Sequence, residues 1–437
     1  MKNKDVILKK LFALQRFGIK PGLERTIKLS EIIGNPHTKF PSIHIAGTNG
    51  KGSVCSLLSS IFIEAGYKVG LYTSPHIKDF NERIRINGEK ISDEKLVSLV
   101  DELLPYQEKF NNTFFEITTV SAFKYFADEN IDIAIIETGM GGGFDSTNII
   151  NPILSIITKI DVDHSQYLGN TIEKIAFEKA GIMKQNSNTI ISQENHKLKK
   201  VFEQYSKINK LNFEFSKSQH INNVSFNEDL TMTCDIEFKN KIFKNIQINL
   251  SGRHQIENLN LTFCSLEYLS NFFDISDKSI LNGLKNIKSN SGYFGRITDL
   301  NQIFKTNFPI IIDVAHNPDA IKNSLESLKL HFPNIKKWNI IFAMMKDKDI
   351  LLSLELLMPY CDKLIITQPT IQRAASVKEI YHLASELNFV IETEPNIYKI
   401  PQMILNSNHP TLIVGSFYLI GDLIEATEKI LKIKIEI

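Results

Sequence analysis

The sequence predicts an α/β protein with two domains, a larger one that carries a phosphate-binding loop and a smaller one at the C-terminal end. Three observations support this fold class. Short runs rich in Ile and Val alternate with helical patterns up to about residue 185, as expected for parallel strands joined by helices. The same alternation returns near residue 309, after a change in composition between residues 186 and 250. A chain of 437 residues is also long enough to bury two separate cores.

The elements of the larger domain follow from hydrophobic periodicity. Apolar residues between Val54 and Phe62 fall on one face of a helix, and Gly66 ends the pattern, so this segment predicts a helix that packs on the sheet. The buried strands of the sheet are short apolar runs that are rich in β-branched residues. They are expected at residues 42–46, 69–73, 131–137 and 153–160.

The end of the larger domain is expected to change from a helix to antiparallel strands. A helix is predicted over 171–180, with Asn170 and Glu173 as a start that resembles a capping box and Gly181 as its end. From about residue 186 to residue 250 the chain is rich in Asn, Lys and Phe, and apolar residues alternate with polar ones. This alternation predicts antiparallel strands that are appended to the domain.

The smaller domain is expected to follow a linker. Helices are predicted between residues 255 and 287, and the Ser- and Gly-containing segment 289–293 indicates a linker. Beyond it, strands are expected at residues 309–314, 338–343, 363–367 and 411–415. The two domains are therefore assigned to residues 1–290 and 297–437.

The composition excludes several classes of function. The 50 basic residues nearly balance the 49 acidic ones, so no charge excess indicates nucleic acid or an anionic membrane as a partner. Four cysteines without a CxxC pair or a neighbouring His cluster indicate neither a zinc site nor a disulfide framework. The first residues lack the apolar stretch of a signal peptide, and no apolar run is long enough to span a bilayer. A cytoplasmic protein is expected.

The segment Gly47-Thr-Asn-Gly-Lys-Gly-Ser53 lies between a predicted strand and a predicted helix. Its glycines allow backbone N–H groups to turn toward a phosphate, the helix N-terminus adds a positive dipole end, and Lys51 adds a full charge. The spacing differs from the Walker pattern, because Gly52 separates Lys51 from Ser53 and Gly47 lies only four residues before the lysine. A flexible loop is the alternative, but the flanking strand and helix favour phosphate binding.

Ser74, Glu137 and His164 each follow a predicted strand. The carboxyl ends of parallel strands meet at one edge of a sheet, where the ligands of open α/β folds collect. A carboxylate such as Glu137 at the end of an apolar strand is costly unless it is paired or bound to a metal. Hydroxyl and carboxylate oxygens suit Mg²⁺, with a histidine as its less usual ligand. A capping or ion-paired role for Glu137 and a structural role for His164 are the alternatives.

Short motifs follow one another along most of the chain. Those in the larger domain are Gly22-Leu-Glu-Arg25, the loop at 47–53, Thr73-Ser-Pro-His76, Phe80-Asn-Glu-Arg-Ile84, Glu137-Thr-Gly-Met-Gly-Gly142, Asp145-Ser-Thr-Asn148, Asp163-His164, Glu178-Lys-Ala-Gly-Ile182 and Gly252-Arg-His-Gln255 with Asn258. Those that follow are Gly295-Arg296, Asp313-Val-Ala-His-Asn-Pro318, Lys346-Asp-Lys-Asp349 and Gly415-Ser-Phe-Tyr418. In this order the motifs resemble those of the folylpolyglutamate synthase/dihydrofolate synthase family of the Mur-ligase superfamily. The resemblance implies a P-loop Mur-ligase-like central domain and a smaller C-terminal Rossmann-like α/β domain.

The resemblance also implies a role for each matching residue. The ATP phosphates would be bound by Asn49, Gly50, Lys51, Gly52 and Ser53, and the adenine, phosphate and ribose contacts would come from Asn258, Arg296 and Asp313. Two Mg²⁺ ions would be held by Ser74, Glu137, His164 and Lys179. The pterin and benzoyl groups would be bound by Gly22, Leu23, Phe115, Glu116, Asp145 and Ser146. Lys51, Glu137, His164 and Lys179 are then the catalytic candidates.

Lys179 matches the lysine that is carbamylated in the family. An ammonium would repel Mg²⁺, whereas a carbamate is an anionic oxygen ligand, so the modification fits a metal site. Considered alone, Lys179 would be interpreted as a solvated lysine on a helix. One departure from the family concerns Gly143, which stands where members usually have an arginine. It removes a planar cation near the expected substrate pocket.

The implied reaction is an ATP-dependent ligation. The carboxylate of dihydropteroate or of a reduced folate would attack the γ-phosphate of ATP, and the amine of L-glutamate would then attack the acyl phosphate. Closure of the domains around these small-molecule substrates is expected to complete the site, and the family implies a monomer. We expect both activities, because the two reactions share one activated carboxylate and one amine.

Three other interpretations stay open at this point. The chain could be a monofunctional member of the family. It could be another Mur-type amino-acid ligase, although no nucleotide-sugar domain precedes Lys51. It could also be a P-loop regulatory NTPase that ligates nothing. Turnover of ATP that depends on both glutamate and a folate would separate the ligase from the regulator.

Overall fold

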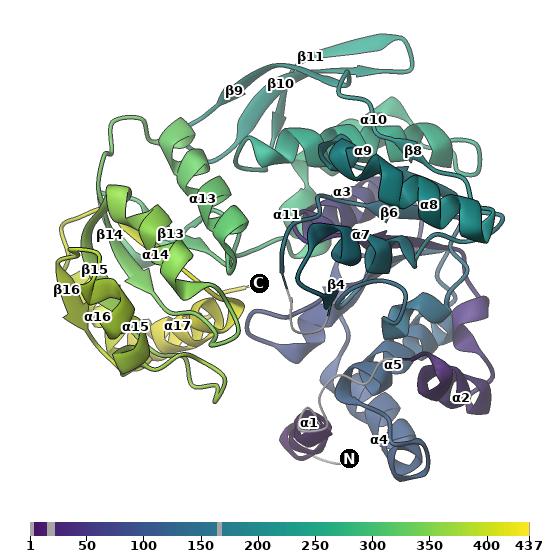
Figure 1. The fold of residues 1–437 in the computed structure, drawn as a ribbon, viewed down its shortest axis with the longest axis horizontal. Helices are drawn as coiled ribbons and strands as arrows, with labels where there is room; N and C mark the ends of the chain where they lie inside the picture. The colour runs from purple at the N-terminus through teal and green to yellow at the C-terminus, as the bar shows by residue number, and fades with distance from the viewer. Residues whose placement is uncertain (1–3, 15–21, 164–167, 437) are drawn as a thin grey trace.

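The computed structural model describes residues 4–14, 22–163 and 168–436, and these form two mainly parallel sheets with helices around them and a smaller antiparallel sheet (Figure 1). The strands of the first sheet are β1 (Ser42–Ala46), β2 (Val69–Tyr72), β3 (Ile84–Ile86), β4 (Glu89–Lys90), β5 (Ile133–Glu137), β6 (Leu154–Ile157), β7 (Asn188–Ile191) and β8 (Glu214–Phe215). Their spatial order is β4-β3-β2-β5-β1-β6-β7-β8. The pairs are parallel except at β3 and β4, which form an antiparallel edge. We call the part of the chain built on this sheet the first domain.

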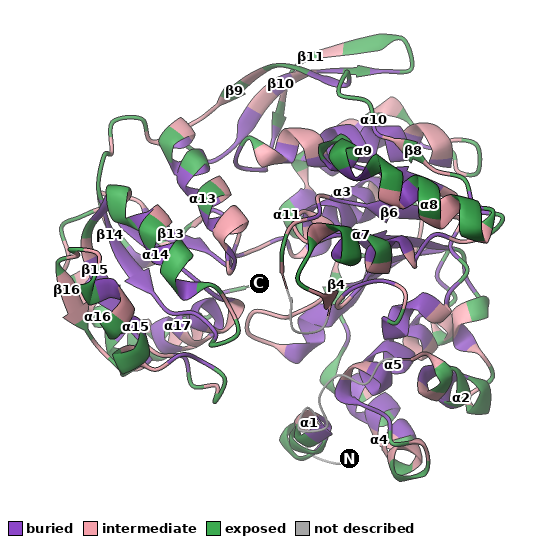
Figure 2. Ribbon diagram, in the orientation of Figure 1, coloured by how far each residue is buried: buried purple, intermediate pink, exposed green. Residues whose placement is uncertain are grey.

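Helices cover both faces of the first sheet. One face carries α3 (Lys51–Glu64), α9 (His254–Leu269), α10 (Asp277–Lys285) and α11 (Ile287–Ser291). The other carries α1 (Lys4–Ala13), α2 (Glu24–Ile32), α4 (Asp93–Phe110) and α5 (Phe114–Asp128). Successive side chains of a strand point to opposite faces, so Ile133 and Ile135 join the first core while Ala134 and Ile136 join the second. Burial on both faces explains the continuous apolar runs in these strands (Figure 2).

The segment between residues 186 and 250 is only partly antiparallel, so its prediction is wrong in its first half. β7 and β8 extend the parallel sheet, and they are joined through α8 (Lys199–Asn209), which packs on α7 (Ile172–Ala180). The predicted antiparallel strands appear only afterwards, as β9 (Ile221–Phe226), β10 (Met232–Phe238) and β11 (Lys241–Ile248). The sequence signal was weak because α8 buries a single residue fully, Phe202, and β8 is two residues long.

The second sheet has six strands in the order β12-β13-β17-β14-β15-β16. They are β12 (Thr298–Asp299), β13 (Ile310–Asp313), β14 (Trp338–Phe342), β15 (Cys361–Ile366), β16 (Ile391–Thr393) and β17 (Thr411–Val414), and only β12 is antiparallel. The helices around it are α12 (Asn301–Phe304), α13 (Pro318–His331), α14 (Ile350–Leu357), α15 (Val377–Ser385), α16 (Ile400–Leu405) and α17 (Phe417–Leu431). This part is called the second domain, and its four predicted strands are confirmed as β13, β14, β15 and β17.

Two local predictions need correction. The helix α7 is capped by Thr171, whose side chain accepts a hydrogen bond from the backbone N–H of Lys174, and not by Asn170. The expected linker at 289–293 is largely the end of α11, and Tyr293 is buried rather than exposed. Helix patterns place caps to within a residue or two only, because neighbouring polar residues compete for the same role.

The loop between β9 and β10 reaches from the first domain into the second. Leu230 is buried in a core of the second domain together with Leu328 of α13. The ring Nδ1 of His331, at the end of α13, lies 2.5 Å from the backbone oxygen of Asn227. Besides the chain that leads from α11 to β12, this loop therefore gives a further contact between the domains. None of the described helices is both long and apolar enough to cross a membrane.

Candidate active site between the two domains

The loop after β1 has the geometry expected of a phosphate-binding loop. β1 is fully buried, and α3 begins at Lys51, so residues 47–50 make the turn between strand and helix. Gly47 and Gly50 have φ angles of 153° and 93°, which L side chains rarely adopt. The loop and the first turn of α3 line a cleft between the domains, so the positive end of that helix lies at the cleft.

Two distant residues approach the loop where it has no side chains. A Cβ atom at Gly50 would lie 2.4 Å from Oδ1 of Asn258, and one at Gly52 would lie 3.2 Å from Nη2 of Arg296. Asn258 belongs to α9, whereas Arg296 comes from the chain that enters the second domain. The structure thus brings together the loop, Asn258 and Arg296, the residues to which the family resemblance assigned contacts with ATP.

Glu137 and Ser74 lie side by side at the carboxyl ends of adjacent strands. The backbone N–H of Ser74 donates to Oε2 of Glu137 over 3.1 Å. Nζ of Lys51 is 3.9 Å from Oε1 of Glu137, and it also donates to the backbone oxygens of Gly47 and Thr48. Burial raises the pKa of Glu137, while the charge of Lys51 opposes that shift. The buried carboxylate of Glu137 is thus held next to the phosphate-binding loop, at the outer limit of an ion pair with Lys51.

Lys179 lies at the same place and is not a solvated lysine. Its side chain is buried in α7, and Nζ donates to the backbone oxygen of Gly47 over 2.7 Å. Burial lowers the pKa of Lys179 to about 7, and the nearby charge of Lys51 acts in the same direction. At neutral pH a large fraction of this amine is therefore uncharged, which is the form that reacts with carbon dioxide.

The donor atoms at this point fit a magnesium ion. Ser74 and Glu137 offer hydroxyl and carboxylate oxygens, and both line the cleft with Lys179 and Asp163. Among the described residues, no group of three or more His, Cys, Asp or Glu could hold a metal ion. His164, the remaining predicted ligand, lies outside the described residues.

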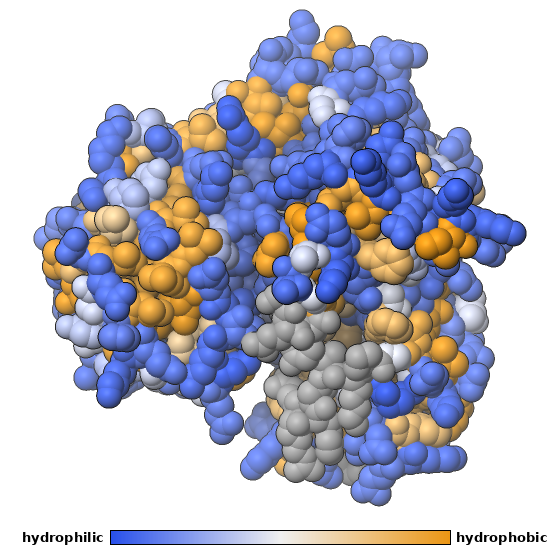
Figure 3. Space-filling model, in the orientation of Figure 1, coloured by the Kyte–Doolittle hydropathy of each residue, from blue (hydrophilic) through white to orange (hydrophobic). Residues whose placement is uncertain are grey.

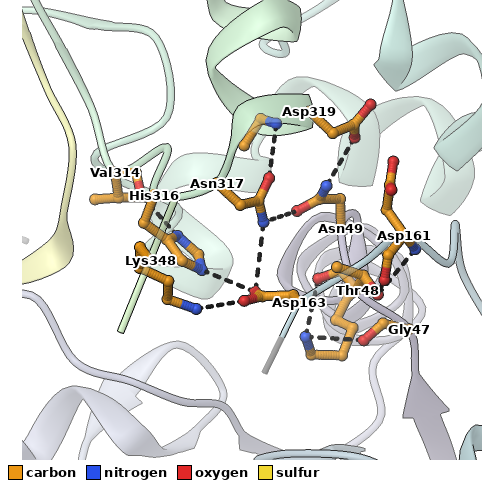
Figure 4. A network of polar contacts seen from close by, with 12 residues as sticks. Gly47, Thr48, Asn49, Asp161, Asp163, Val314, His316, Asn317, Asp319 and Lys348 are labelled. Atoms are coloured by element: carbon orange, nitrogen blue, oxygen red, sulfur yellow. Dashed lines mark hydrogen bonds and ion pairs between the residues drawn. The ribbon is translucent and has the colours of Figure 1, made fainter. Parts of the chain in front are cut away.

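Asp163 connects the first domain to the second (Figure 4). Nζ of Lys348 lies 2.5 Å from Oδ1 of Asp163, and both side chains are less than a tenth exposed. Nδ2 of Asn317 donates to Oδ2 of Asp163 over 3.4 Å, and Nε2 of His316 is 3.7 Å from the same oxygen. Three residues of the second domain thus meet one carboxylate that follows β6.

A second set of contacts holds the P-loop itself. Nδ2 of Asn49 donates to Oδ2 of Asp319 over 2.7 Å, and Oδ1 of Asn49 accepts from Asn317 over 3.3 Å. The other oxygen of Asp319 pairs with Nζ of Lys159, which follows β6, over 2.5 Å. Asn317 and Asp319 stand at the start of α13, so this helix end is tied to the loop through Asn49 (Figure 4). The surface between the domains is mainly hydrophilic in the view of Figure 3.

Ser53 and Asp313, the other predicted nucleotide contacts, are buried and already hydrogen-bonded. The hydroxyl of Ser53 lies 3.1 Å from that of Tyr293. Asp313 ends β13 and accepts from the hydroxyl of Ser324 over 2.7 Å and from the N–H of Ala315 over 2.9 Å. Burial raises the pKa of Asp313 to about 6. Asp313, unlike Arg296, is not among the residues that line the cleft.

The residues predicted to bind the pterin lie on α2, on α5 and in the loop after β5, and these elements pack against one another. The ring of Phe115 covers Gly139, where a Cβ atom would lie 2.4 Å from it. Gly22 and Leu23 immediately precede α2, and Ser146 begins the short helix η4 (Ser146–Ile149). These positions form one group beside the cleft.

Two members of that group carry carboxylates that are already engaged. Oε1 of Glu116 pairs with Arg25 over 2.9 Å, and Oε2 accepts from the N–H of Thr113. Asp145 accepts from the hydroxyl of Thr147 over 2.5 Å and from the N–H of Met140 over 2.8 Å. Both carboxylates therefore hold the surrounding loops in place through these hydrogen bonds.

Sequence reasoning missed the residues that join the domains, among them Lys159 and Asp319. It also gave no role to Lys348, although that lysine stands in a quoted motif, 346–349. No local pattern marks these residues, because each has its partner in the other domain. A charged residue directly after a buried strand or in the first turn of a helix was the only signal available.

The chain resembles known proteins over nearly its whole length. Residues 45–266 match the Mur ligase middle domain, and residues 296–417 match the Mur ligase glutamate ligase domain. A dihydrofolate synthase/folylpolyglutamate synthase from Bacillus subtilis is 35% identical over 421 residues, which cover 93% of this chain and 95% of that protein.

Solved structures agree with this assignment. The folylpolyglutamate synthase from Thermotoga maritima is 31% identical, with a TM-score of 0.80 over 96% of each chain. The Mycobacterium tuberculosis folylpolyglutamate synthase complexed with ADP and AMPPCP is 25% identical, with a TM-score of 0.84 over 99% of this chain and 100% of that one. With the motifs in order, both family domains matched and the cleft assembled from both, the chain belongs to the dihydrofolate synthase/folylpolyglutamate synthase family of Mur ligases.

Proposed function

We propose that this protein is an ATP-dependent ligase that adds L-glutamate to 7,8-dihydropteroate and to reduced folates. The observation that carries the proposal is the buried Glu137 carboxylate between Ser74 and Lys51, at the mouth of a P-loop that faces the second domain. A regulatory NTPase needs the loop, but it has no need of a second domain tied to it through Asn49. Family membership and the name of the Bacillus subtilis relative support the same reaction.

The chain's own residues serve the reaction by binding and neutralising charge. We assign the ATP phosphates to residues 49–53 and Arg296, the adenine to Asn258 and the ribose to Asp313. Transfer of the γ-phosphate to the substrate carboxylate shifts negative charge along the phosphates, and Lys51 is placed to offset it. Attack by the glutamate amine on the acyl phosphate then forms the amide and releases phosphate.

The metal and the pterin assignments are part of the proposal. Magnesium, when bound, would polarise the phosphate oxygens, and Ser74, Glu137, His164 and a carbamylated Lys179 would hold two ions. Gly22, Leu23, Phe115, Glu116, Asp145 and Ser146 would border the pterin and benzoyl groups, with Glu116 and Asp145 acting through the loops they fix. We also retain residues 1–290 and 297–437 as the domain limits, and a monomer as the working form.

The test is incorporation of labelled glutamate by the purified protein at saturating ATP and Mg²⁺. Incorporation with dihydropteroate and, separately, with a tetrahydrofolate is the expected result. Incorporation with only one acceptor reduces the proposal to a monofunctional ligase. ATP hydrolysis without any incorporation would favour a regulatory NTPase instead.

A further inference from the structure

Four buried polar side chains form a chain of hydrogen bonds beside the phosphate-binding loop. Nδ2 of Asn258 donates to Oε1 of Gln255 over 2.8 Å, and Nε2 of Gln255 donates to the hydroxyl of Tyr293 over 3.0 Å. The hydroxyl of Tyr293 in turn lies 3.1 Å from that of Ser53. All four side chains are buried, so a partner that is lost from this chain cannot simply be replaced by water.

These four residues come from three separate parts of the chain. Ser53 lies in the first turn of α3, while Gln255 and Asn258 lie in the first two turns of α9. Tyr293 follows α11 on the way to the second domain, three residues before Arg296. The hydrogen bonds therefore join the phosphate-binding loop to α9 and to the segment that carries Arg296 to that loop.

The donors and acceptors give this chain of hydrogen bonds a direction. The amide of Gln255 has its protons directed to the oxygen of Tyr293 and to Nε2 of His254, which lies 3.1 Å away. Because the oxygen of Tyr293 accepts from Gln255, the phenol proton goes to the hydroxyl oxygen of Ser53. Burial raises the pKa of Tyr293, so the phenol keeps this proton at neutral pH.

The hydroxyl proton of Ser53 is then left for a ligand. Its oxygen accepts from Tyr293, and Nε2 of Gln255 lies 3.4 Å from it as a second donor. With its oxygen engaged in this way, the proton of Ser53 has no hydrogen-bond acceptor among the residues that the structure describes. Ser53 directly follows Gly52, which lines the cleft, so an acceptor that enters the cleft lies on the side of this hydroxyl.

We propose that Tyr293 is a positioning residue for the nucleotide, which turns the hydroxyl proton of Ser53 toward a phosphate oxygen. The inference rests on the proposed function, because it takes residues 49–53 as the phosphate site. In the opposite arrangement Ser53 would donate to Tyr293 and present only its lone pairs to an anion, which is unfavourable. Hydrogen bonds in a buried chain polarise one another, so the donor at Gln255 strengthens the donor at Ser53. Tyr293 does not touch the nucleotide and acts through Ser53.

The test compares the Kd of the purified protein for ATP, ADP and adenosine. Tyr293→Phe removes only the hydroxyl, and we expect it to raise the Kd for ATP and for ADP by about fivefold, as for loss of one hydrogen bond. The Kd for adenosine, which has no phosphate, should stay unchanged. Ser53→Ala should show the same pattern, and adding Tyr293→Phe to it should cause no further loss, because Tyr293 acts through the hydroxyl of Ser53.

Tyr72→Phe is the matched control. It also removes a buried phenol hydroxyl, which lies 3.2 Å from that of Thr119, but on the opposite face of the first sheet. A comparable fall in melting temperature is expected for Tyr72→Phe and Tyr293→Phe, whereas only Tyr293→Phe should change the Kd for ATP. The comparison separates a role in nucleotide binding from a role in stability.

Three results overturn the positioning role: an unchanged Kd for ATP in folded Tyr293→Phe, an equal weakening of adenosine and ATP, and additive losses in the double variant. If Tyr293→Phe does not fold, Ser53→Ala decides, because an unchanged Kd for ATP in that variant also overturns the role. Wild-type protein that binds ATP but incorporates no glutamate overturns the proposed ligase alone. An active wild type whose variants bind ATP normally overturns the role of Tyr293 alone.

Discussion

The two domains contribute different kinds of charge to the cleft. In the first domain, Glu137 and Lys179 are buried and Lys51 is partly exposed, Lys51 lies 3.9 Å from Glu137, and both lysines donate to backbone oxygens. In the second domain, Asp319 and Lys348 form short ion pairs with the first. A charged side chain without a close ion-pair partner can interact with a charged substrate. A charged side chain that already has a partner in the other domain instead holds the two domains together. The comparison suggests that the first domain supplies the chemistry and the second supplies closure.

The largest effect is expected for Lys51. Lys51→Ala should lower turnover by about a hundredfold or more, because it removes the charge that offsets the shifting phosphate charge. The melting temperature should change little, since the side chain is partly exposed and fills no core. Steady-state rates and thermal melts measure both. A folded variant with wild-type turnover would show that the chemistry does not depend on this loop.

The next prediction concerns Lys179, the second lysine of the first domain at the cleft. Lys179→Ala should be inactive, and ¹³C-bicarbonate should give a carbamate signal in the wild type that the variant lacks. Since the pKa of Lys179 is about 7, the amine is mainly protonated at pH 6 and mainly neutral at pH 8, so the signal should grow as the pH rises between them. A free amine found by mass analysis of the native ATP-bound protein would contradict the carbamate.

The ion pairs of the second domain should have smaller effects on binding. We expect a weakening of ATP binding by about fivefold, or about 1 kcal/mol, for each of the variants Asp319→Asn and Lys348→Met. The weakening should be smaller at high salt, because salt screens the ion pairs. The partner variants Lys159→Gln and Asp163→Asn complete two double-mutant cycles. The exposed pair Lys363–Glu392, which lies within the second domain, is the matched control and should show no coupling. If the effects of the two single variants on ATP binding simply add in both cycles, the ion pairs do not contribute to domain closure.

The smallest effect on stability is expected at Gly143. A Cβ atom there would meet nothing closer than 3.5 Å, so Gly143→Arg should change the free energy of unfolding by about 0.5 kcal/mol or less. A change in the KM for each pterin acceptor then measures what an arginine at this position contributes to binding of that acceptor. Gly181→Ala provides the contrast, because its Cβ would lie 2.2 Å from the Cα of Gly143 and must displace the backbone. If Gly143→Arg and Gly181→Ala were equally stable, the close contact between Gly181 and Gly143 would be contradicted.

Much of the first domain's site could be predicted from the sequence because its signals are local. A strand, a glycine-rich turn and a helix adjoin in the sequence, and β1 appears where expected, while α3 begins at Lys51, inside the predicted loop. Lys179 was different, since its pattern is that of an exposed helical lysine, and only the family resemblance singled it out. Its burial depends on contact with Gly47, 132 residues away.

What could not be predicted are the contacts that depend on the assembled fold. Nothing near Asp319 in the sequence indicates Asn49 as its partner, because the two are 270 residues apart. The same holds for Asp163, whose partner Lys348 lies 185 residues farther along the chain. The error at 186–215 has another cause, since α8 and β8 bury too few side chains to produce a clear period.

The loop that carries Leu230 has a mechanical consequence. A body fastened to another at one point can swing in any direction, but a body fastened at two points can turn only about the line that joins them. Leu230 with Asn227 forms one fastening, and the chain from α11 to β12 forms the other. While this loop contact holds, opening of the other contacts turns the second domain about the line that joins these two points. Rotation about one line brings Arg296 and Asn317 to the P-loop along a single path.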